Sequence, residues 1–475
     1  MRFRFLALGL AAAGGIALAI ACGEDSPSIP DVSQLPDATP VDDSGGGGDD
    51  AGIDAQPCTP PERPDDTRGI FVSTAGADGA TCGTRQSPCR SIAQGIARAG
   101  MGAKSVVYIA QGQYDERVKL AAGIELNGGW LVDGITTDWA KACGDVKNQI
   151  VVLHAPKTEN VTVEATNLVG DAGAVTDLTI ETKAQSQVLP SESIYGLFVV
   201  GAATEVDLTN VILEKVSAGG NGADGKNGDA GADGGANCTT AGTGAAGTPG
   251  TNGTGAAAGS FDPTGYTAAG GTNGAPGGDG QNGTAAPDPP CVACGACAAV
   301  TCAFTPDGTQ SCGTKGSAGC AGIGGTAGNA ATGGGSSIAI YCYDAIVKIN
   351  GGRFTAGNGG SGGIGGSGGA GGKGAPAARG ANGADCTVGC NAVDPVTCNN
   401  VAGHGDAGLE GGVGGPGGAG GNGGGGAGGW SIALFQGGTG QITPSGATLA
   451  HGTAGKGGGP DGGAGTPGTA ADRYP

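Results

Sequence analysis

Residues 76–100, GADGATCGTRQSPCRSIAQGIARAG, and residues 106–130, VVYIAQGQYDERVKLAAGIELNGGW, decide the fold. The first stretch places Ser87 and Pro88 as N-cap and first helical residue before an apolar face of Ile92, Ala93, Ile96 and Ala97, which predicts a short helix. The second opens a series of short apolar runs, at 106–109, 118–120, 124–126, 150–153, 161–163, 175–180 and 206–213. Short strands with almost no helix between them fit either a β-sandwich or a parallel β-helix.

The same two stretches resemble the N-terminal cap and first rungs of the pectate-lyase-like β-helix families. There a Gly-Thr and Pro-Cys turn leads into a capping helix, and a rung reads v-x-i-x-x-G-x-Y-x-E-x-V, which Gly112, Tyr114, Glu116 and Val118 match. The resemblance covers roughly residues 69–215. It implies a mainly β fold, a right-handed parallel β-helix, in families that include many polysaccharide lyases and hydrolases.

The second half of the chain contains most of the 108 glycines, yet three similar apolar islands interrupt it, at 195–219, 338–357 and 432–452. Each island is a small set of strands followed by an exit into glycine. Successive β-helix rungs with long excursions on one side would have this pattern. The alternative is a separate disordered tail, but a disordered tail does not explain why the three islands resemble one another.

Glycine recurs at every third residue within the excursions, for example over 222–234, 271–283 and 405–429. A polyproline II-type helix has three residues per turn, so glycine would line one side and admit a neighbouring backbone. Triplets with two glycines and few prolines favour bundled extended helices over a collagen triple helix. The composition resembles the glycine-rich repeats of bacterial surface proteins of the PGRS type, and only this repeat resemblance carries over.

The N-terminus reads as an export signal followed by a tether. Residues 1–21 combine Arg2 and Arg4 with an apolar run, and residues 18–22 (LAIAC) resemble a bacterial lipobox, which implies lipidation of Cys22. Residues 22–57 are acidic, contain no Lys or Arg, and predict a disordered linker. Gly23 after the cysteine favours anchoring in the outer membrane, with the folded part exposed at the cell surface.

The predicted organisation follows from these features. It comprises a lipoprotein signal peptide (1–21), a lipid-anchored linker (22–57), a β-helix domain with an N-terminal capping helix (58–215), a Gly/Cys-rich excursion (216–335), a rung (336–356), a Gly-rich excursion (357–429), and a last rung with a Gly-rich tail (430–475).

An exported chain makes disulfides the default for the 15 cysteines that remain after Cys22. Cys82 and Cys89 flank a turn, Cys58 is a candidate partner of Cys143, and Cys342 is a candidate for the unpaired thiol. The run CVACGACAAVTC (291–302) resembles an iron–sulfur ligand run, but its spacing fails before the fourth cysteine. Disulfide staples are the preferred interpretation, and no cofactor is predicted.

Two further motifs suggest calcium binding and catalysis, but other features of the sequence argue against both. Asp224 and Asp233 lie nine residues apart in a calcium β-roll-like pattern, but the large apolar residue of each turn is missing, so a solvated loop is favoured and no metal is predicted. His404 lies between two glycines in a glycine run, and His154 and His451 have no recognisable partner. No paired-Asp motif lies on a rung, so no catalytic residue is predicted.

The net charge of −19 excludes nucleic acid as a partner. The sequence favours a non-catalytic, surface-anchored structural or interaction lipoprotein, whose partners are the membrane and an envelope or extracellular polysaccharide or another surface protein. Asn210 is equally compatible with a turn stack and with a single solvated turn. The alternative functions are a polysaccharide-binding or polysaccharide-cleaving β-helix protein and, less favoured, a flat glycine face that binds ordered water or ice.

Overall fold

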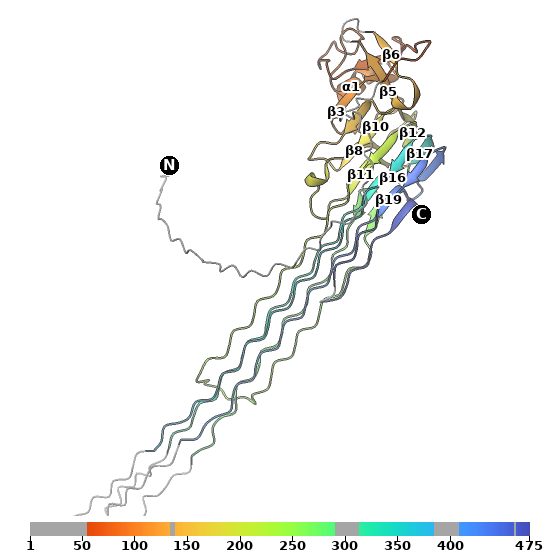
Figure 1. The fold of residues 1–475 in the computed structure, drawn as a ribbon. Helices are drawn as coiled ribbons and strands as arrows, with labels where there is room; N and C mark the ends of the chain where they lie inside the picture. The colour runs from red at the N-terminus through yellow and green to blue at the C-terminus, as the bar shows by residue number, and fades with distance from the viewer. Residues whose placement is uncertain (1–54, 134–137, 290–312, 384–407, 460–461) are drawn as a thin grey trace, which may run out of the picture. The chain divides into compact units, whose positions relative to one another are not determined.

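A computed structural model of the chain describes residues 55–133, 138–289, 313–383, 408–459 and 462–475. All of these residues belong to one compact unit, Ile53–Pro475. Its strands and its glycine segments occupy separate regions (Figure 1).

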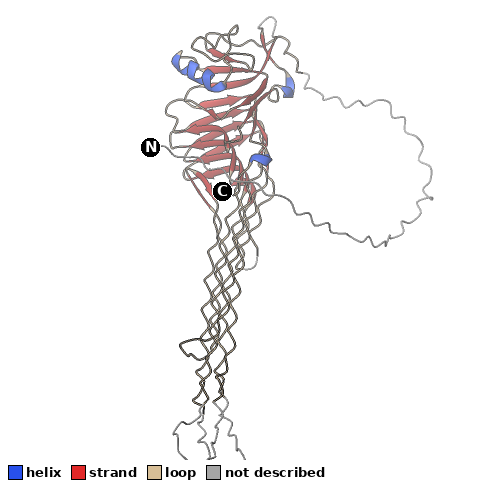
Figure 2. Cartoon of the chain, turned by 90° about the vertical axis from the view of Figure 1, so that its left-hand side faces the viewer, coloured by secondary structure: helices blue, strands red, loops and turns tan. Residues whose placement is uncertain are grey.

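The strands form three parallel sheets that the chain visits in turn, which defines a parallel β-helix (Figure 2). The first sheet contains β1 (Gly69–Val72), β2 (Val106–Ala110), β5 (Glu125–Val132), β9 (Gly173–Thr176), β12 (Glu205–Thr209), β17 (Ile346–Asn350) and β20 (Gln441–Ser445), with the antiparallel β6 (Trp139–Lys141) on β5. The second contains β3 (Gly112–Asp115), β7 (Val151–His154), β10 (Thr179–Glu181), β13 (Ile212–Lys215), β18 (Arg353–Thr355) and β21 (Thr448–Ala450). The third contains β4 (Val118–Lys119), β8 (Val161–Thr166), β11 (Ile194–Val200), β16 (Ser337–Tyr343), β19 (Ser431–Gly437) and β22 (Ala470–Tyr474). The expected fold class is therefore confirmed, and the β-sandwich alternative is excluded.

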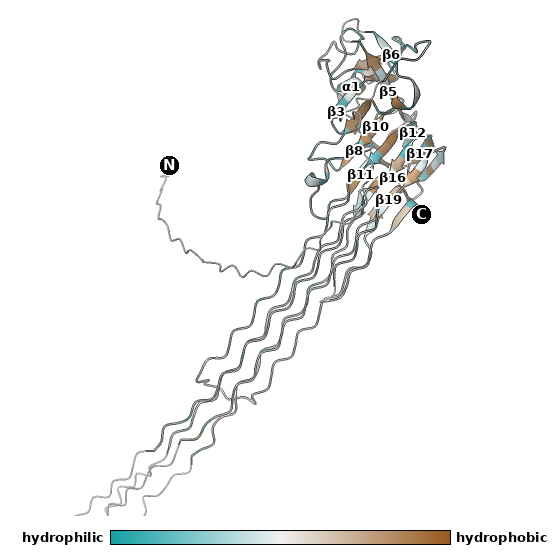
Figure 3. Ribbon diagram, in the orientation of Figure 1, coloured by the Kyte–Doolittle hydropathy of each residue, from teal (hydrophilic) through white to brown (hydrophobic). Residues whose placement is uncertain are grey.

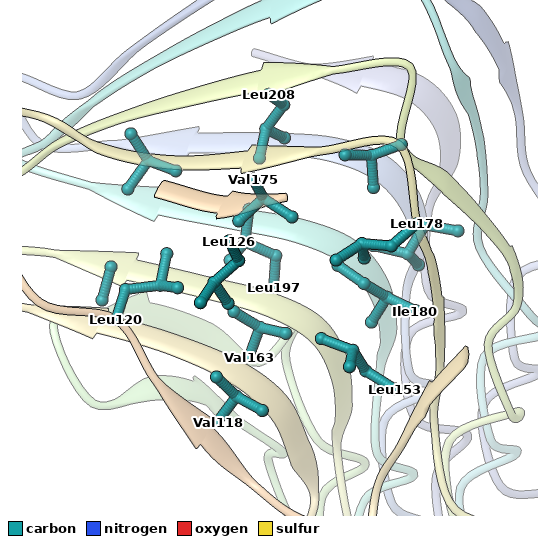
Figure 4. Close-up of a cluster of buried hydrophobic side chains, with 14 of the residues drawn as sticks. Val118, Leu120, Leu126, Leu153, Val163, Val175, Leu178, Ile180, Leu197 and Leu208 are labelled. Atoms are coloured by element: carbon teal, nitrogen blue, oxygen red, sulfur yellow. The ribbon is translucent and has the colours of Figure 1, made fainter. Parts of the chain in front are cut away.

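The core lies inside the three sheets, where aliphatic side chains from successive rungs stack on one another. Leu126, Val175 and Leu208 come from neighbouring strands of the first sheet and are almost fully buried (Figure 4). Hydrophobic residues are accordingly concentrated on the strands (Figure 3). Each rung buries apolar area only against its neighbours, so stability accumulates along the stack.

The helix α1 (Ile92–Met101) covers the first rungs and packs on β1 and β2. It begins four residues later than the Ser87-Pro88 pair predicted, because Cys89 pairs with Val72 as a β-bridge and Ser91 is the N-cap. The Ser91 hydroxyl accepts the N–H of Gln94 at 3.2 Å. The chain upstream of Ser91 is thus held in the sheet and is not available to the helix.

The rung motif that suggested the family has a physical explanation in this cap. Tyr114 is buried and donates to the Ala110 carbonyl at 3.0 Å. Glu116 accepts the N–H groups of Ile92 (2.7 Å) and Ala93 (3.0 Å) at the start of α1. A carboxylate is favourable there because it satisfies orphan donors at the positive end of the helix dipole.

Replacing Glu116 by alanine is expected to lower the free energy of unfolding by about 1–2 kcal/mol, the usual cost of a lost N-terminal cap. Hydrogen exchange should accelerate over residues 92–101. Gln113→Ala, at an exposed site on β3 three residues before Glu116, is the control and should change stability by less than about 0.5 kcal/mol. Equal effects of the two changes would contradict the capping role.

The corner between the first and second sheets is a stack of left-handed turn residues. Asp177 (φ 52°), Asn210 (φ 51°), Gly351 (φ 76°) and Gly446 (φ 66°) occupy it on successive rungs. The predicted strands 175–180 and 206–213 are each therefore two strands separated by this corner. Asn210 does belong to a turn stack, since its amide donates to Asp177 Oδ1 at 3.1 Å.

All three glycine excursions leave the β-helix at one place, between the second and third sheets. They connect β13 to β16, β18 to β19 and β21 to β22. The described parts form eight extended segments: PG1 (217–235), PG2 (242–257), PG3 (269–284), PG4 (316–335), PG5 (357–380), PG6 (411–429), PG7 (452–458) and PG8 (462–468). The expected excursions on one side of the rungs are confirmed.

Backbone hydrogen bonds at three-residue intervals join these segments into a bundle. Residues 417, 420 and 423 of PG6 donate to residues 372, 369 and 366 of PG5, each at 2.8 Å. PG4 is linked in the same way to PG1, PG3 and PG6. The period of three matches a polyproline II-type helix, whose backbone polar groups have no partner within their own segment.

Glycine occupies those rows of a segment where a neighbouring backbone leaves no room for a Cβ. PG1 needs one glycine row, which faces carbonyl oxygens of PG4. PG6 needs two, because one row faces PG4 and the other, including Gly421, faces PG2. Its third row carries exposed Val413, Pro416 and Ala419, and changes to Gly425 and Gly428 where PG7 packs against it.

The hairpin of β14 (Ser260–Asp262) and β15 (Gly265–Thr267), between PG2 and PG3, was not foreseen from the sequence. It packs on aromatic side chains of the third sheet: the Phe261 ring stacks on Phe435 with centroids 4.2 Å apart, and the Tyr266 N–H donates to the Tyr195 hydroxyl at 2.7 Å. Two isolated aromatic residues in a glycine region were its only sequence signal. The hairpin fixes the bundle to the β-helix.

Candidate functional site

The second sheet carries a row of ionisable side chains on its outer face. Asp115, His154, Glu181 and Lys215 are in register on β3, β7, β10 and β13, one on each successive rung. Their inward neighbours, such as Leu153 and Ile180, are buried in the core. We call these four residues the polar ladder.

His154 is at the centre of the acid–base chemistry that the polar ladder offers. Its Nδ1 lies 2.9 Å from Asp115 Oδ1, and Glu181 is on the neighbouring strand, where Lys215 Nζ lies 2.7 Å from its Oε1. Parallel strands are about 4.8 Å apart, so the two carboxyl-bearing residues flank His154 at a backbone separation of about 9.6 Å. A histidine oriented by a carboxylate can act as a general base or acid through its other nitrogen.

The sequence-based view that His154 and His451 lack partners is wrong. His451 Nδ1 lies 2.7 Å from Asp472 Oδ1. Asp115 is 39 residues from His154 and Asp472 is 21 residues from His451, so only the folding of the chain into rungs brings each pair together. Among the residues that the structure describes, no hydroxyl or thiol is hydrogen-bonded to either imidazole.

A second ionic group, at the corner stack, is structural because it is sealed from solvent. Lys141 and Asp177 are 5% and 6% exposed, with Nζ 2.9 Å from Oδ2. Lys141 also donates to Asn127 Oδ1 and to the Gly128 carbonyl at 2.7 and 2.6 Å. Burial lowers the pKa of Lys141, and the charge of Asp177 opposes this shift.

The described cysteines are structural. Disulfides join Cys58 to Cys143 and Cys82 to Cys89, the two pairs named from the sequence, and Cys238 to Cys320 within the bundle. The geometric group Asp78, Cys82 and Cys89 has both its sulfurs in one disulfide, so it offers no thiolate to a metal. Cys342 on β16 is the free cysteine of the described residues, as predicted.

Cys342 is expected to resist iodoacetamide in the native protein at pH 8. Burial raises the pKa of its thiol to about 11, so roughly one molecule in a thousand carries the reactive thiolate. Peptide mass spectrometry should find Cys342 alkylated only after unfolding in denaturant. Rapid alkylation of the folded protein would show that this rung is open.

Asp224 and Asp233, the two aspartates of the calcium β-roll-like pattern, have a structural role in the bundle. Asp224 Oδ1 accepts the N–H of Ile364, and Asp233 Oδ1 accepts that of Lys373, each at 2.7 Å. Asn221 and Asn227 make the same bond to PG5 at 2.9 Å. These side chains therefore complete the hydrogen bonding of PG1 with PG5.

Several sequence-based predictions lie outside the described residues. They concern Cys22, the cysteine run at 291–302, and His404. No helix in the described ranges has the length and apolar character needed to cross a bilayer.

No protein-family model matches the chain. No curated protein matches it either. Among solved structures the chain is similar to a pectin methylesterase in complex with a hexasaccharide (17% identity, 31% of this chain, 44% of that chain, TM-score 0.20). It is also similar to the catalytic domain of a GH87 α-1,3-glucanase in complex with tetrasaccharides (15%, 36%, 28%, TM-score 0.19) and to a pectin methylesterase from Erwinia chrysanthemi (13%, 30%, 52%, TM-score 0.15). The chain spans about half or less of these structures, so the assignment as a parallel β-helix depends on its own strand register.

Proposed function

We propose that the chain is a lipid-anchored protein of the bacterial cell surface with a structural or interaction role, in which the β-helix carries the glycine bundle as a stiff spacer. The bundle is the observation that carries this proposal. Its segments bond laterally to several neighbours, as PG6 does to PG2, PG3, PG4 and PG5 and, near its C-terminal end, to PG7 and PG8. An array bonded in this way resists bending, whereas a glycine-rich chain without such bonds is a flexible coil.

The side chains of the bundle support a role at a surface. The residues between glycines are mostly small or polar, and exposed Lys226 and Lys373 lie on its outside. The net charge of −19 favours solubility and opposes self-association. This is the composition of a spacer in water and not of a buried element.

Surface display is tested by labelling intact cells with a membrane-impermeant amine reagent. The proposal expects modification of Lys226 and Lys373 before lysis. Modification of both lysines only after lysis would place the bundle inside the envelope and overturn this part of the proposal.

The anchor is tested by Cys22→Ala. This variant should lose incorporation of labelled palmitate and leave the membrane fraction, since several acyl chains are needed for stable anchoring. Unchanged labelling would refute lipidation at Cys22, and the Cys342→Ala variant controls for loss of any other cysteine.

The polar ladder favours a second candidate function, binding or cleavage of a polysaccharide on the outer face of the β-helix. A screen of acidic and neutral glycans for binding and for new reducing or unsaturated ends distinguishes the two functions. If turnover is found, His154→Gln and Glu181→Gln should reduce it at least about a hundredfold, the usual contribution of an acid–base group. His451→Gln is the matched control, because that histidine also pairs with an aspartate but follows β21, four strands from the strand β7 that carries His154.

A further inference from the structure

A pocket of about 420 Å³ lies beside α1. Its walls are the segment 66–71, the loop 81–86 and the C-terminal end of α1 with Gly102 and Lys104. The disulfide Cys82–Cys89 closes the loop, so two walls are held by a covalent bond and by a helix. Preformed pockets of this size are typical of small-ligand sites.

The charge of this pocket is opposite to that of the whole chain. Arg85, Arg98 and Lys104 line it together with one carboxylate, Asp66. Asp66 is 63% exposed and pairs with Arg85 at 2.5 Å, so it neutralises one cation at the rim. The lining keeps two positive charges in a protein whose net charge is −19.

Arg98 and Lys104 can still donate hydrogen bonds to a ligand in this pocket. Arg98 uses Nε on the Cys82 carbonyl at 3.3 Å, and its two terminal nitrogens donate no hydrogen bond within the described part of the chain. Among the described residues, the acceptors of Lys104 Nζ are neutral: the carbonyls of Asp66 (2.9 Å) and Thr67 (2.7 Å). A guanidinium fork and an ammonium that line one pocket suit an anionic group with paired oxygens, such as a carboxylate or phosphate.

We propose that this pocket binds the carboxylate or phosphate group of a small organic anion of about the size of a monosaccharide. Arg98 supplies the bidentate contact and Lys104 the second charge. The anion is either a free metabolite or the end group of an anionic polymer, since both present the same oxygens. The inference does not depend on the polar ladder or on the lipid anchor.

The test is calorimetry on the folded protein with glucuronate, glucose 6-phosphate, inorganic phosphate, a uronate oligomer and, as neutral control, glucose. Glucuronate or glucose 6-phosphate should bind with a dissociation constant on the order of 1 mM or tighter, and glucose should not. Tighter binding of the oligomer than of glucuronate would identify a polymer end, and equal binding a free metabolite. Binding of inorganic phosphate alone would mean an adventitious ion only and would overturn the proposal.

Two variants locate the site. Arg98→Gln combined with Lys104→Gln should weaken binding at least about tenfold, because two charge-assisted hydrogen bonds are lost. Arg90→Gln removes one positive charge from an exposed residue of the same cap that does not line the pocket, and should change affinity by less than about twofold. A melting curve of the double variant checks that it is folded. Unchanged binding in a folded double variant, or no anion binding by the parent protein, would refute the site.

Discussion

Replacing Gly421 by valine is expected to disrupt the glycine bundle. A Cβ at this position would lie 1.9 Å from the carbonyl oxygen of Thr251, and the obstructing atoms are backbone, which cannot rotate away. Gly421 also donates to Ala275 and accepts from Gly328, so displacing it breaks the contacts of PG6 with PG3 and PG4. Overpacking costs up to about 3 kcal/mol in ordinary cores, and we expect at least this much here.

Thermal unfolding and limited proteolysis within 242–429 measure the effect. Ala419→Val is the matched control, because it adds the same side chain two residues away on the exposed row of PG6. The control should melt within about 1 °C of the parent, as surface substitutions usually do. If Gly421→Val had the same melting temperature and the same resistance to protease as Ala419→Val, the close packing of PG6 against PG2 would be wrong.

Replacing Asp177 by asparagine is expected to lower the free energy of unfolding by about 3–5 kcal/mol, the cost of leaving one member of a buried ion pair without its partner. Asparagine tolerates the left-handed backbone of this corner and nearly keeps the side-chain shape, so the effect isolates the charge. Urea denaturation at pH 7 is the measurement. A loss below about 1 kcal/mol would show that Lys141 does not need the carboxylate.

The same pair predicts how stability depends on pH in the variant. Burial already lowers the pKa of Lys141, and removing Asp177 removes a group that raises it. Between the folded and unfolded pKa values the unfolded state then binds more protons, so the stability of Asp177→Asn should rise as the pH approaches the ordinary lysine value. Adding Lys141→Met to Asp177→Asn should abolish this dependence and recover part of the lost stability.

The fold was accessible from the sequence because two of its regularities are local. The rung motif around Tyr114 and Glu116 lies within one segment, and the period of three places glycine on one side of an extended chain whatever the neighbour. The three apolar islands then located the rungs. The corner at Asp177 was missed because Val175, Leu178 and Ile180 look like one apolar run, although the three-residue step from Val175 to Leu178 breaks the alternation of a single strand.

The candidate sites were much less accessible, because their residues meet only through the register of the stack. His154 and Asp115 lie on different rungs, and no spacing rule joins them until the strands are aligned. The pocket beside α1 is lined by Arg85, Arg98 and Lys104, which come from a loop, the helix and the segment after the helix. The hairpin at 260–267 was hidden in a glycine region, where its function is to cover aromatic side chains far away in sequence.

The central claim is that the glycine segments are ordered by lateral backbone hydrogen bonds on a β-helix stem. Hydrogen exchange of the amides of Gly417, Gly420 and Gly423, which donate to PG5 inside the bundle, tests it most directly. The account predicts protection comparable to that of β16 and β19 in the same sample. Exchange of these three amides at the rate of an unstructured chain, with the strands still protected, would contradict it.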